Sequence, residues 1–142
     1  MIVKNKAKII KDVEIKTVLP EEKITIGQVS QIKVVMKPKE NMWLRYIFFE
    51  LLNERTDKRA PKDRITSRSR YHYRYNVDET ITNEEESQYI FPMRIPIHKE
   101  PSRDDKFICI KWQLHLKAYM SATEEDNELL QVNAPSIDVQ IF

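Results

Sequence analysis

The stretch Tyr89–Tyr119, YIFPMRIPIHKEPSRDDKFICIKWQLHLKAY, decides the fold of this chain. Apolar residues alternate with others over 89–97 and again over 108–118. A period of two with one apolar side is typical of a β-strand that buries one face. We therefore predict two long strands joined by a charged loop that contains Pro101.

Two prolines lie inside the first of these strands. Pro92 and Pro96 cannot donate a backbone hydrogen bond to a neighbouring strand. Such residues are confined to edge strands or bulges, so we expect the strand over 89–97 to lie at a sheet edge.

The remaining strands follow from the same alternation. We expect them over 9–19, 29–36, 42–52, 65–77 and 132–142. The run over 42–52 is apolar almost throughout, which predicts a central strand buried on both faces rather than a helix.

Charged loops are expected over 53–63 and 78–87, with a further polar loop over 121–128. Gly27 is the only glycine, and we expect it to form a tight bend, because glycine alone takes positive φ without strain. About seven or eight strands without a convincing helix predict an all-β fold, an antiparallel two-sheet β-sandwich of arrestin or immunoglobulin type. We expect residues 1–142 to form one such domain.

Composition points to a globular protein. Hydrophobic residues make up 41% and charged residues 32% of the 142 positions. No apolar run approaches the roughly 18 residues that a membrane span needs, and residues 1–16 contain no uninterrupted apolar core of a signal peptide. A single cysteine, Cys109, fits a reducing compartment, so we expect a cytoplasmic location. One glycine and many charged residues are also compatible with a thermophile.

Basic residues cluster although the net charge is only +2. Over 65–77 three tyrosines would face one side of a strand, toward the core, and basic residues the other. The basic residues are Arg64, Arg68, Arg70 and Arg74. Second neighbours on one face of a strand are about 7 Å apart, and guanidinium groups bind carboxylates or phosphates in a bidentate manner. The alternative is a solvated outer face that is paired to acids such as those at 84–86.

A family resemblance appears at this point. The run Phe91–Ile97, then Pro101-Ser102, then Lys111–Leu114 ahead of Ala118 resembles the arrestin-like sandwich. Residues 24–29 and 44–51 are similar to the opening strands of that family.

The chain also departs from the family pattern. It lacks the usual glycine after Pro101-Ser102, has one glycine in the opening segment, and holds one sandwich where full arrestins hold two. The resemblance implies a non-enzymatic binding scaffold without a cofactor, as in trafficking adaptors, a retromer subunit and bacterial sporulation-control proteins.

No catalytic or metal-binding motif stands out. His72, His98 and His115 each stand alone, without a cysteine or a second histidine at metal-ligand spacing. Cys109 has no activating base beside it in the sequence. We therefore predict no enzymatic activity, no metal and no cofactor.

The sequence therefore predicts a protein that binds another protein, through an acidic or extended segment. The segment would add to an edge strand near Tyr89, Phe91 and Arg94, while the basic strand selects acidic side chains. Three alternatives remain: a nucleic-acid-binding protein that uses the same arginines, contact with an anionic membrane surface, and self-association as a coat subunit.

Overall fold

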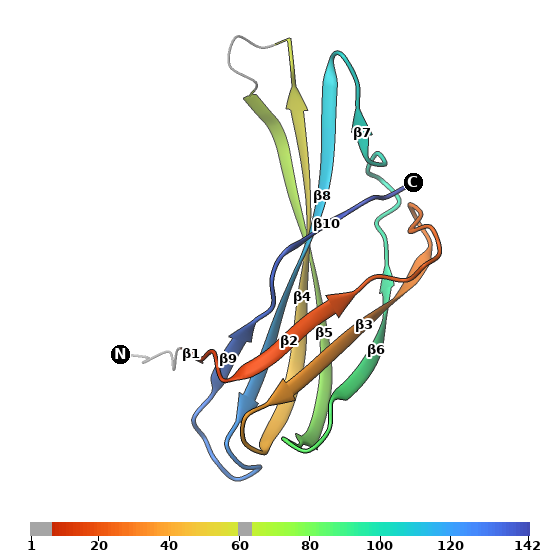
Figure 1. The fold of residues 1–142 in the computed structure, drawn as a ribbon. Coiled ribbons are helices and arrows are strands. Elements are labelled where there is room, and N and C mark those ends of the chain that lie inside the picture. The colour runs from red at the N-terminus through yellow and green to blue at the C-terminus, as the bar shows by residue number, and fades with distance from the viewer. Residues whose placement is uncertain (1–6, 60–63) are drawn as a thin grey trace.

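Two packed β-sheets form the molecule (Figure 1). The computed structural model describes residues 7–59 and 64–142, and of residues 64–66 it describes the backbone alone. This part of the chain holds ten strands and no helix, which confirms the predicted all-β sandwich. It therefore also contains no helix long and apolar enough to cross a membrane.

The larger sheet, which we call the long sheet, is built around three strands. These are β4 (Met42–Asp57), β5 (Arg64–Ile81) and β8 (Ile108–Ser121), with β4 between the other two. The far edge of β8 pairs in turn with three short strands, which are β7 (Arg103–Asp104), β10 (Ile137–Val139) and β9 (Leu130–Asn133). The strand β1 (Lys8–Ile9) pairs with β9 in parallel.

The smaller sheet, which we call the short sheet, contains β2 (Val13–Val18), β3 (Val29–Pro38) and β6 (Ser87–Arg94) in that order. It crosses the long sheet diagonally and covers only its lower half (Figure 1). The upper part of the long sheet projects beyond it. We call this part the arm and define it as residues 52–57 of β4, 64–70 of β5 and 108–113 of β8, which pair with one another.

The core lies between the two sheets in the lower half. Phe49 is fully buried there and packs edge-on against Tyr75 and Phe91, with ring centroids 6.1 and 5.8 Å away. Alternate residues of each strand supply the rest of the core, as a half-buried strand requires. They include Ile32, Val34, Met36, Leu44, Ile47, Leu51, Met93, Leu114, Leu116, Ala118 and Met120.

Gly27 forms the predicted bend. Its φ is +77°, and its amide donates to the carbonyl oxygen of Ile95 at 3.0 Å. A side chain at this position would meet Ile97, whose Cγ1 would lie 3.4 Å from an added Cβ. The bend therefore fixes the end of β6 against the start of β3.

Two strands are longer than their sequence predicts. The segment 53–57 was expected to be a loop and is the end of β4, and β5 continues to Ile81, so that the connection after it spans only 82–86. The prediction fails because the inward-facing positions of the arm are polar, such as Asn53 and Arg55, although the period of two continues.

The central strand β4 is fully buried on its inner face and only partly buried on its outer face. Its inward apolar residues are buried, whereas on the opposite side Leu52 is 8% exposed and Phe48 and Glu50 are partly exposed. The expected burial on both faces therefore holds only in part, because no described element covers the outer side of the long sheet.

The two ends of the chain are more broken than expected. Residues 9–19 divide into β1 and β2, and residues 132–142 divide into β9 and β10. Ile141 then leaves the long sheet and bridges Ile24 near the short sheet. The last residues therefore tie the two sheets together.

Candidate partner-binding face

The outer face of the long sheet, meaning the side that faces away from the short sheet, gathers most of the predicted basic residues. The register places Arg68, Arg70, His72 and Arg74 of β5 beside Glu54, Leu52, Glu50 and Phe48 of β4. On the other side of β4 the same residues pair with Lys111, Gln113, His115 and Lys117 of β8. Each row thus runs across three strands, a span of about 10 Å.

Part of this face is internally paired. Arg68 Nε lies 3.1 Å from Glu54 Oε1, and His72 Nε2 lies 3.1 Å from Glu50 Oε2. The acids therefore come from the neighbouring strand β4, and the expected pairing with the acids at 84–86 is wrong. Exposed pairs of this kind contribute little to stability.

Aromatic rings cover the lower end of the face. The guanidinium of Arg74 lies 3.9 Å from the centre of the Tyr46 ring, which stacks on Tyr119 at 4.6 Å. Phe48 lies 5.2 Å from the His72 ring. These contacts hold Arg74 flat against the sheet, because a guanidinium over an aromatic face is attracted by its quadrupole.

Three cations on the face have neither an acidic nor an aromatic partner among the described residues. Arg70, Lys111 and Lys117 are exposed, and none of them makes a hydrogen bond or an ion pair with another described residue. Between them on β4 lie the apolar side chains of Leu52, which is only 8% exposed, and Phe48, which is partly exposed. The face therefore offers separated positive charges on either side of an apolar strip.

The backbone of Arg64 is out of register with the other three predicted arginines. Thr66 is an extra residue in β5, since Arg55 pairs with Ser67 and Thr56 with Ile65. The bulge breaks the even spacing from Arg68, and Arg64 pairs with Asp57. Its side chain lies outside the described part of the structure.

The tyrosines on the other side of β5 connect the two sheets. Tyr73 donates its hydroxyl to the carbonyl oxygen of Arg94 at 2.6 Å, and Tyr75 donates to that of Pro92. Burial raises the pKa of Tyr73 to about 12. The prediction that these rings face the core is confirmed, although their hydroxyls reach the edge of β6.

The edge strand β6 is less open than the sequence indicates. It pairs only with β3, so it is an edge strand as predicted. However, two of its carbonyls on the other side accept from Tyr73 and Tyr75, and Pro92 has no amide hydrogen. A partner strand could pair freely only near Gln88 and Ile90.

The three residues predicted on this strand occupy different environments. Phe91 is 8% exposed and belongs to the core, so a partner cannot contact its side chain. Tyr89 is half-buried and donates to Glu79 Oε2 at 3.1 Å, and burial raises its pKa to about 12. Arg94 is exposed and donates to the carbonyl oxygen of Gly27 at 3.1 Å.

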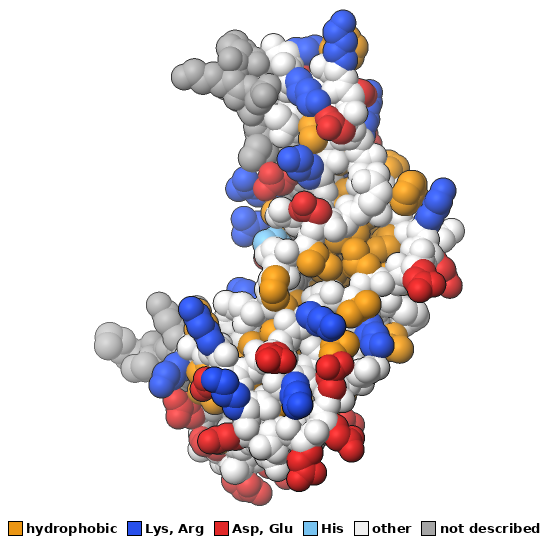
Figure 2. All heavy atoms as spheres, in the orientation of Figure 1, with side chains coloured by type: hydrophobic (Ala, Val, Ile, Leu, Met, Phe, Trp, Pro, Cys, Tyr) orange, Lys and Arg blue, Asp and Glu red, His pale blue; other side chains and the backbone are white. Residues whose placement is uncertain are grey.

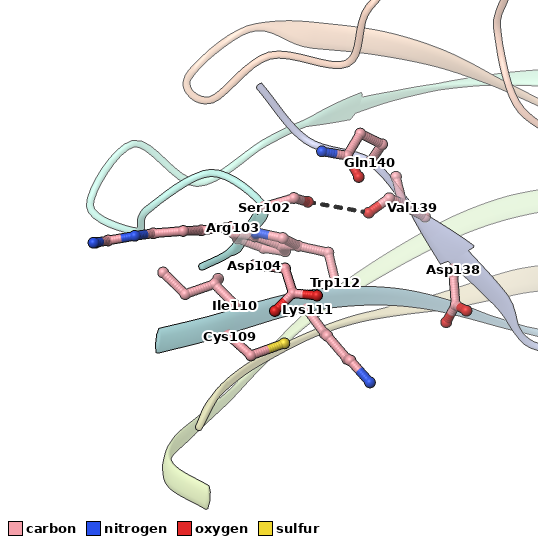
Figure 3. A pocket seen from close by; sticks show the side chains of 10 residues that line it. All are labelled: Ser102, Arg103, Asp104, Cys109, Ile110, Lys111, Trp112, Asp138, Val139 and Gln140. Atoms are coloured by element: carbon pink, nitrogen blue, oxygen red, sulfur yellow. Dashed lines mark hydrogen bonds between the residues drawn. The ribbon is translucent and has the colours of Figure 1, made fainter. Parts of the chain in front are cut away.

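An open pocket lies between β7 and β10 on the opposite edge of the long sheet (Figure 3). Its charged side chains do not converge, because Arg103 and Lys111 point in different directions (Figure 3). Asp104 is engaged by Lys58, and Ser102 accepts from the amide of Ile141 at 2.9 Å. The described residues contain no group of three or more metal-binding side chains.

Comparison with known proteins supports the fold. The chain matches no protein-family model and no curated protein sequence. Its structure is similar to that of Spo0M, a sporulation control protein of Bacillus subtilis, with a TM-score of 0.64 and 18% sequence identity. The match covers 93% of this chain and 50% of Spo0M, so the chain spans half the length of that protein. The resemblance to the arrestin-like sandwich is thereby confirmed at the level of the fold.

Proposed function

We propose that this chain is a non-catalytic scaffold that binds an acidic segment of a partner protein on the outer face of the long sheet. The observation that supports this most is the set of unpaired cations, Arg70, Lys111 and Lys117, around the apolar strip of Leu52 and Phe48. The fold that it shares with a sporulation control protein is consistent with a regulatory binding role.

The geometry defines the segment that fits. Arg70 on β5 lies in the row of Leu52 and Lys117 on β8 lies in the row of Phe48, so the two positions are about 10 Å apart across the sheet and about 13 Å apart along it, or about 16 Å in all. An extended chain covers that distance in about five residues. The face therefore fits a segment with two acidic residues at i and i+5 and apolar residues between them, which would contact Phe48.

Charge complementarity is the reason to favour an acidic partner. Five basic residues of the face, Arg68, Arg70, Arg74, Lys111 and Lys117, stand against four described acids, of which Glu54, Glu50 and Asp104 are paired with Arg68, His72 and Lys58, and Asp138 accepts from Gln113. An acidic segment would be attracted during approach and oriented on binding. Addition of a partner strand to β6 is included in this proposal only near Gln88 and Ile90, because the tyrosine hydroxyls occupy the rest of that edge.

A peptide titration tests the proposal. The probe is a fluorescent peptide with glutamates at i and i+5 and leucines between them, measured by anisotropy against the whole chain. Reversing two charges, as Arg70→Glu with Lys117→Glu, should weaken binding at least about tenfold, equivalent to about 1.4 kcal/mol. The matched control is Lys16→Glu with Lys37→Glu, which makes the same charge change on exposed positions of the short sheet and should leave affinity nearly unchanged.

Three results would contradict the proposal. Equal loss of affinity in both double variants would mean that overall charge alone attracts the peptide. No binding by the unaltered chain would exclude this class of segment. Tighter binding of duplex DNA, with affinity that falls steeply as salt is added, would assign the face to nucleic acid instead.

A further inference from the structure

The strand β5 lies at the edge of the long sheet and pairs with one strand only. All of its pairing is with β4, and no other described strand pairs with its far edge. No backbone hydrogen bond joins residues 67–76 to a described turn or loop. Every second residue of an edge strand points its N–H and C=O away from the sheet. The far edge of β5 therefore offers a row of open backbone donors and acceptors.

Two irregularities limit the part of this edge that is straight. At one end Thr66 is an extra residue in β5, and at the other end Val77 and Asp78 stand against Arg45 alone. Asp78 has a φ of +54°, which is uncommon for a residue other than glycine. Bulges bend a strand and interrupt pairing along it. Between them residues 67–76 pair with β4 without interruption, and we call the far side of this segment the free edge of β5.

The free edge carries no negative charge of its own, because residues 67–76 include no acid. Two of its outward side chains contact acids of β4, since Arg68 pairs with Glu54 and His72 with Glu50. A strand added to this edge would lie about 5 Å from β5 and about 10 Å from β4. Its nearest cross-strand neighbours would therefore be the exposed outward residues of β5, which are Arg68, Arg70, His72, Arg74 and Asn76.

The residues between the arginines favour apolar neighbours. Tyr71, Tyr73 and Tyr75 lie on the inner side of β5, are partly buried and pack against the core. Every second side chain of an added strand would lie beside these rings. The free edge therefore fits a segment in which acidic and apolar residues alternate, and seven such residues would span positions 68–74.

We propose that an acidic segment of a partner protein adds to the free edge of β5 as a further strand of the long sheet, with acidic side chains opposite Arg68, Arg70 and Arg74. This mode of binding combines backbone hydrogen bonds with alternating side-chain contacts. The inference rests on the proposed function for the acidic character of the partner, and it adds a second segment with its own conformation. Arg70 borders both sites, and its five N–H donors are enough for a carboxylate from each segment.

A symmetric peptide tests the added strand. The probe is a capped fluorescent peptide of seven residues that alternate Glu and Val, with Glu at both ends, so that it presents the same pattern in either strand direction. We expect saturable binding to the whole chain by anisotropy at constant ionic strength. In the complex, amide hydrogen exchange followed by nuclear magnetic resonance should slow at alternate residues of 67–76 and stay unchanged in β6.

Two modified peptides separate backbone pairing from charge. One is N-methylated at its valines and the other at its two inner glutamates, so each keeps every charge and loses N–H groups along one edge only. An added strand pairs with β5 through one of its two edges. One modified peptide should therefore bind at least about tenfold more weakly than the parent, whereas the other should stay within about threefold of it.

Two single variants locate the site on the chain. Arg70→Glu should weaken binding of the alternating peptide at least about tenfold, because it places like charges opposite each other. Lys117→Glu reverses one charge of the same outer face two strands away from β5, and it should change this affinity by less than about twofold. Lys117→Glu should nevertheless weaken binding of the peptide with glutamates at i and i+5, so the two proposals can fail separately. If Arg70→Glu does not fold, the modified peptides still provide the test.

Four results would overturn the added strand. The first is no saturable binding of the alternating peptide, and the second is slowed exchange in β6 in place of residues 67–76. Equal affinity of the two modified peptides would show that backbone pairing takes no part in binding. Equal loss of affinity in Arg70→Glu and Lys117→Glu would show that charge alone attracts the peptide.

Discussion

The lower half of the long sheet and its arm use the same three strands in different ways. In the lower half the inner face is apolar and is covered by the short sheet, with Phe49 and Leu116 fully buried. In the arm β4 and β5 carry Asn53, Arg55 and Ser67 on the inner face, beside the buried Ile108, Ile110 and Trp112 of β8, and a loop covers part of it. A single set of strands can thus form a hydrophobic core at one end and a more polar inner face at the other.

The inner face of β4 changes from apolar to polar between two successive inward-facing rows of the sheet. Leu51 pairs with Tyr71 and Leu114, and all three pack on the core. Two residues further along β4, Asn53 pairs with Ser69 and Trp112. Figure 2 shows charged side chains gathered over both ends of the molecule, with hydrophobic side chains between them at its waist. We therefore expect stability to reside mainly in the lower half.

Phe49→Ala should have the largest effect, and it tests whether stability resides in the lower half. The ring is fully buried between the sheets, so its removal should lower the free energy of unfolding by about 3–5 kcal/mol. Urea unfolding followed by fluorescence measures the change. Lys111→Ala, on the exposed side of the arm, should stay within about 0.5 kcal/mol of the unaltered chain. Similar losses in the two variants would contradict the division of the sheet.

Trp112→Phe tests the boundary between the two parts. The indole is 1% exposed and holds Glu100 through its N–H. We expect a loss of about 2 kcal/mol from the smaller ring and the missing hydrogen bond together. Hydrogen exchange should accelerate at 98–100 while the amides of β3 remain protected. Unchanged exchange at 98–100 would mean that the indole does not hold this loop.

Gly27→Ala tests whether the bend that precedes β3 and lies against Ile97 must be a glycine. The residue has a φ of +77°, a region that alanine enters at a cost of about 1–2 kcal/mol. The added methyl group would also touch Ile97. Thermal unfolding should show the loss, whereas Asn127→Ala in an exposed loop should show almost none.

Tyr73→Phe tests the contact between the two sheets and should have the smallest effect of these four variants. Loss of the hydroxyl bond to Arg94 should cost about 1 kcal/mol. The pKa of Tyr73 is raised from 10.0 to about 12 in the folded chain, so the folded state favours the neutral ring. Its contribution is therefore fully present below pH 10 and is lost as the pH rises through about 12.

Absorbance at alkaline pH measures this titration. The spectrum of Tyr73→Phe should lack one of the late-titrating tyrosines, while the signal that belongs to Tyr89, with its pKa also near 12, should remain. A late titration of unchanged amplitude in the variant would contradict the assignment.

Much of the fold could be predicted, because alternation is a local property of the chain. The strands that became β3, β6 and β8, the bend at Gly27 and the edge position of β6 all followed from neighbouring residues. The end of β4 could not be predicted, because polar residues such as Asn53 resemble a loop until the pairing partner is known.

The candidate sites were less accessible to sequence reasoning. The outward positions of Lys111 and Lys117 could be read from the alternation, but their alignment with Arg68 and Arg74 depends on β4 lying between β5 and β8. The free edge of β5 is harder still, since it depends on the order of all the strands in the sheet. The bulge at Thr66, which no local pattern indicates, also moved Arg64 out of register with the other arginines.

The edges of the two sheets have a consequence for growth by lateral pairing. Three short strands pair with one edge of β8, and the tyrosine hydroxyls occupy much of the free edge of β6 in the short sheet. The remaining long strand is β5, whose far edge pairs with no other described strand. Two copies that approached along β5 would bring their Arg68 and Arg70 side chains together, and like charges directly opposite each other are destabilising. The same arginines thus discourage the chain from polymerising with itself, whatever else they bind.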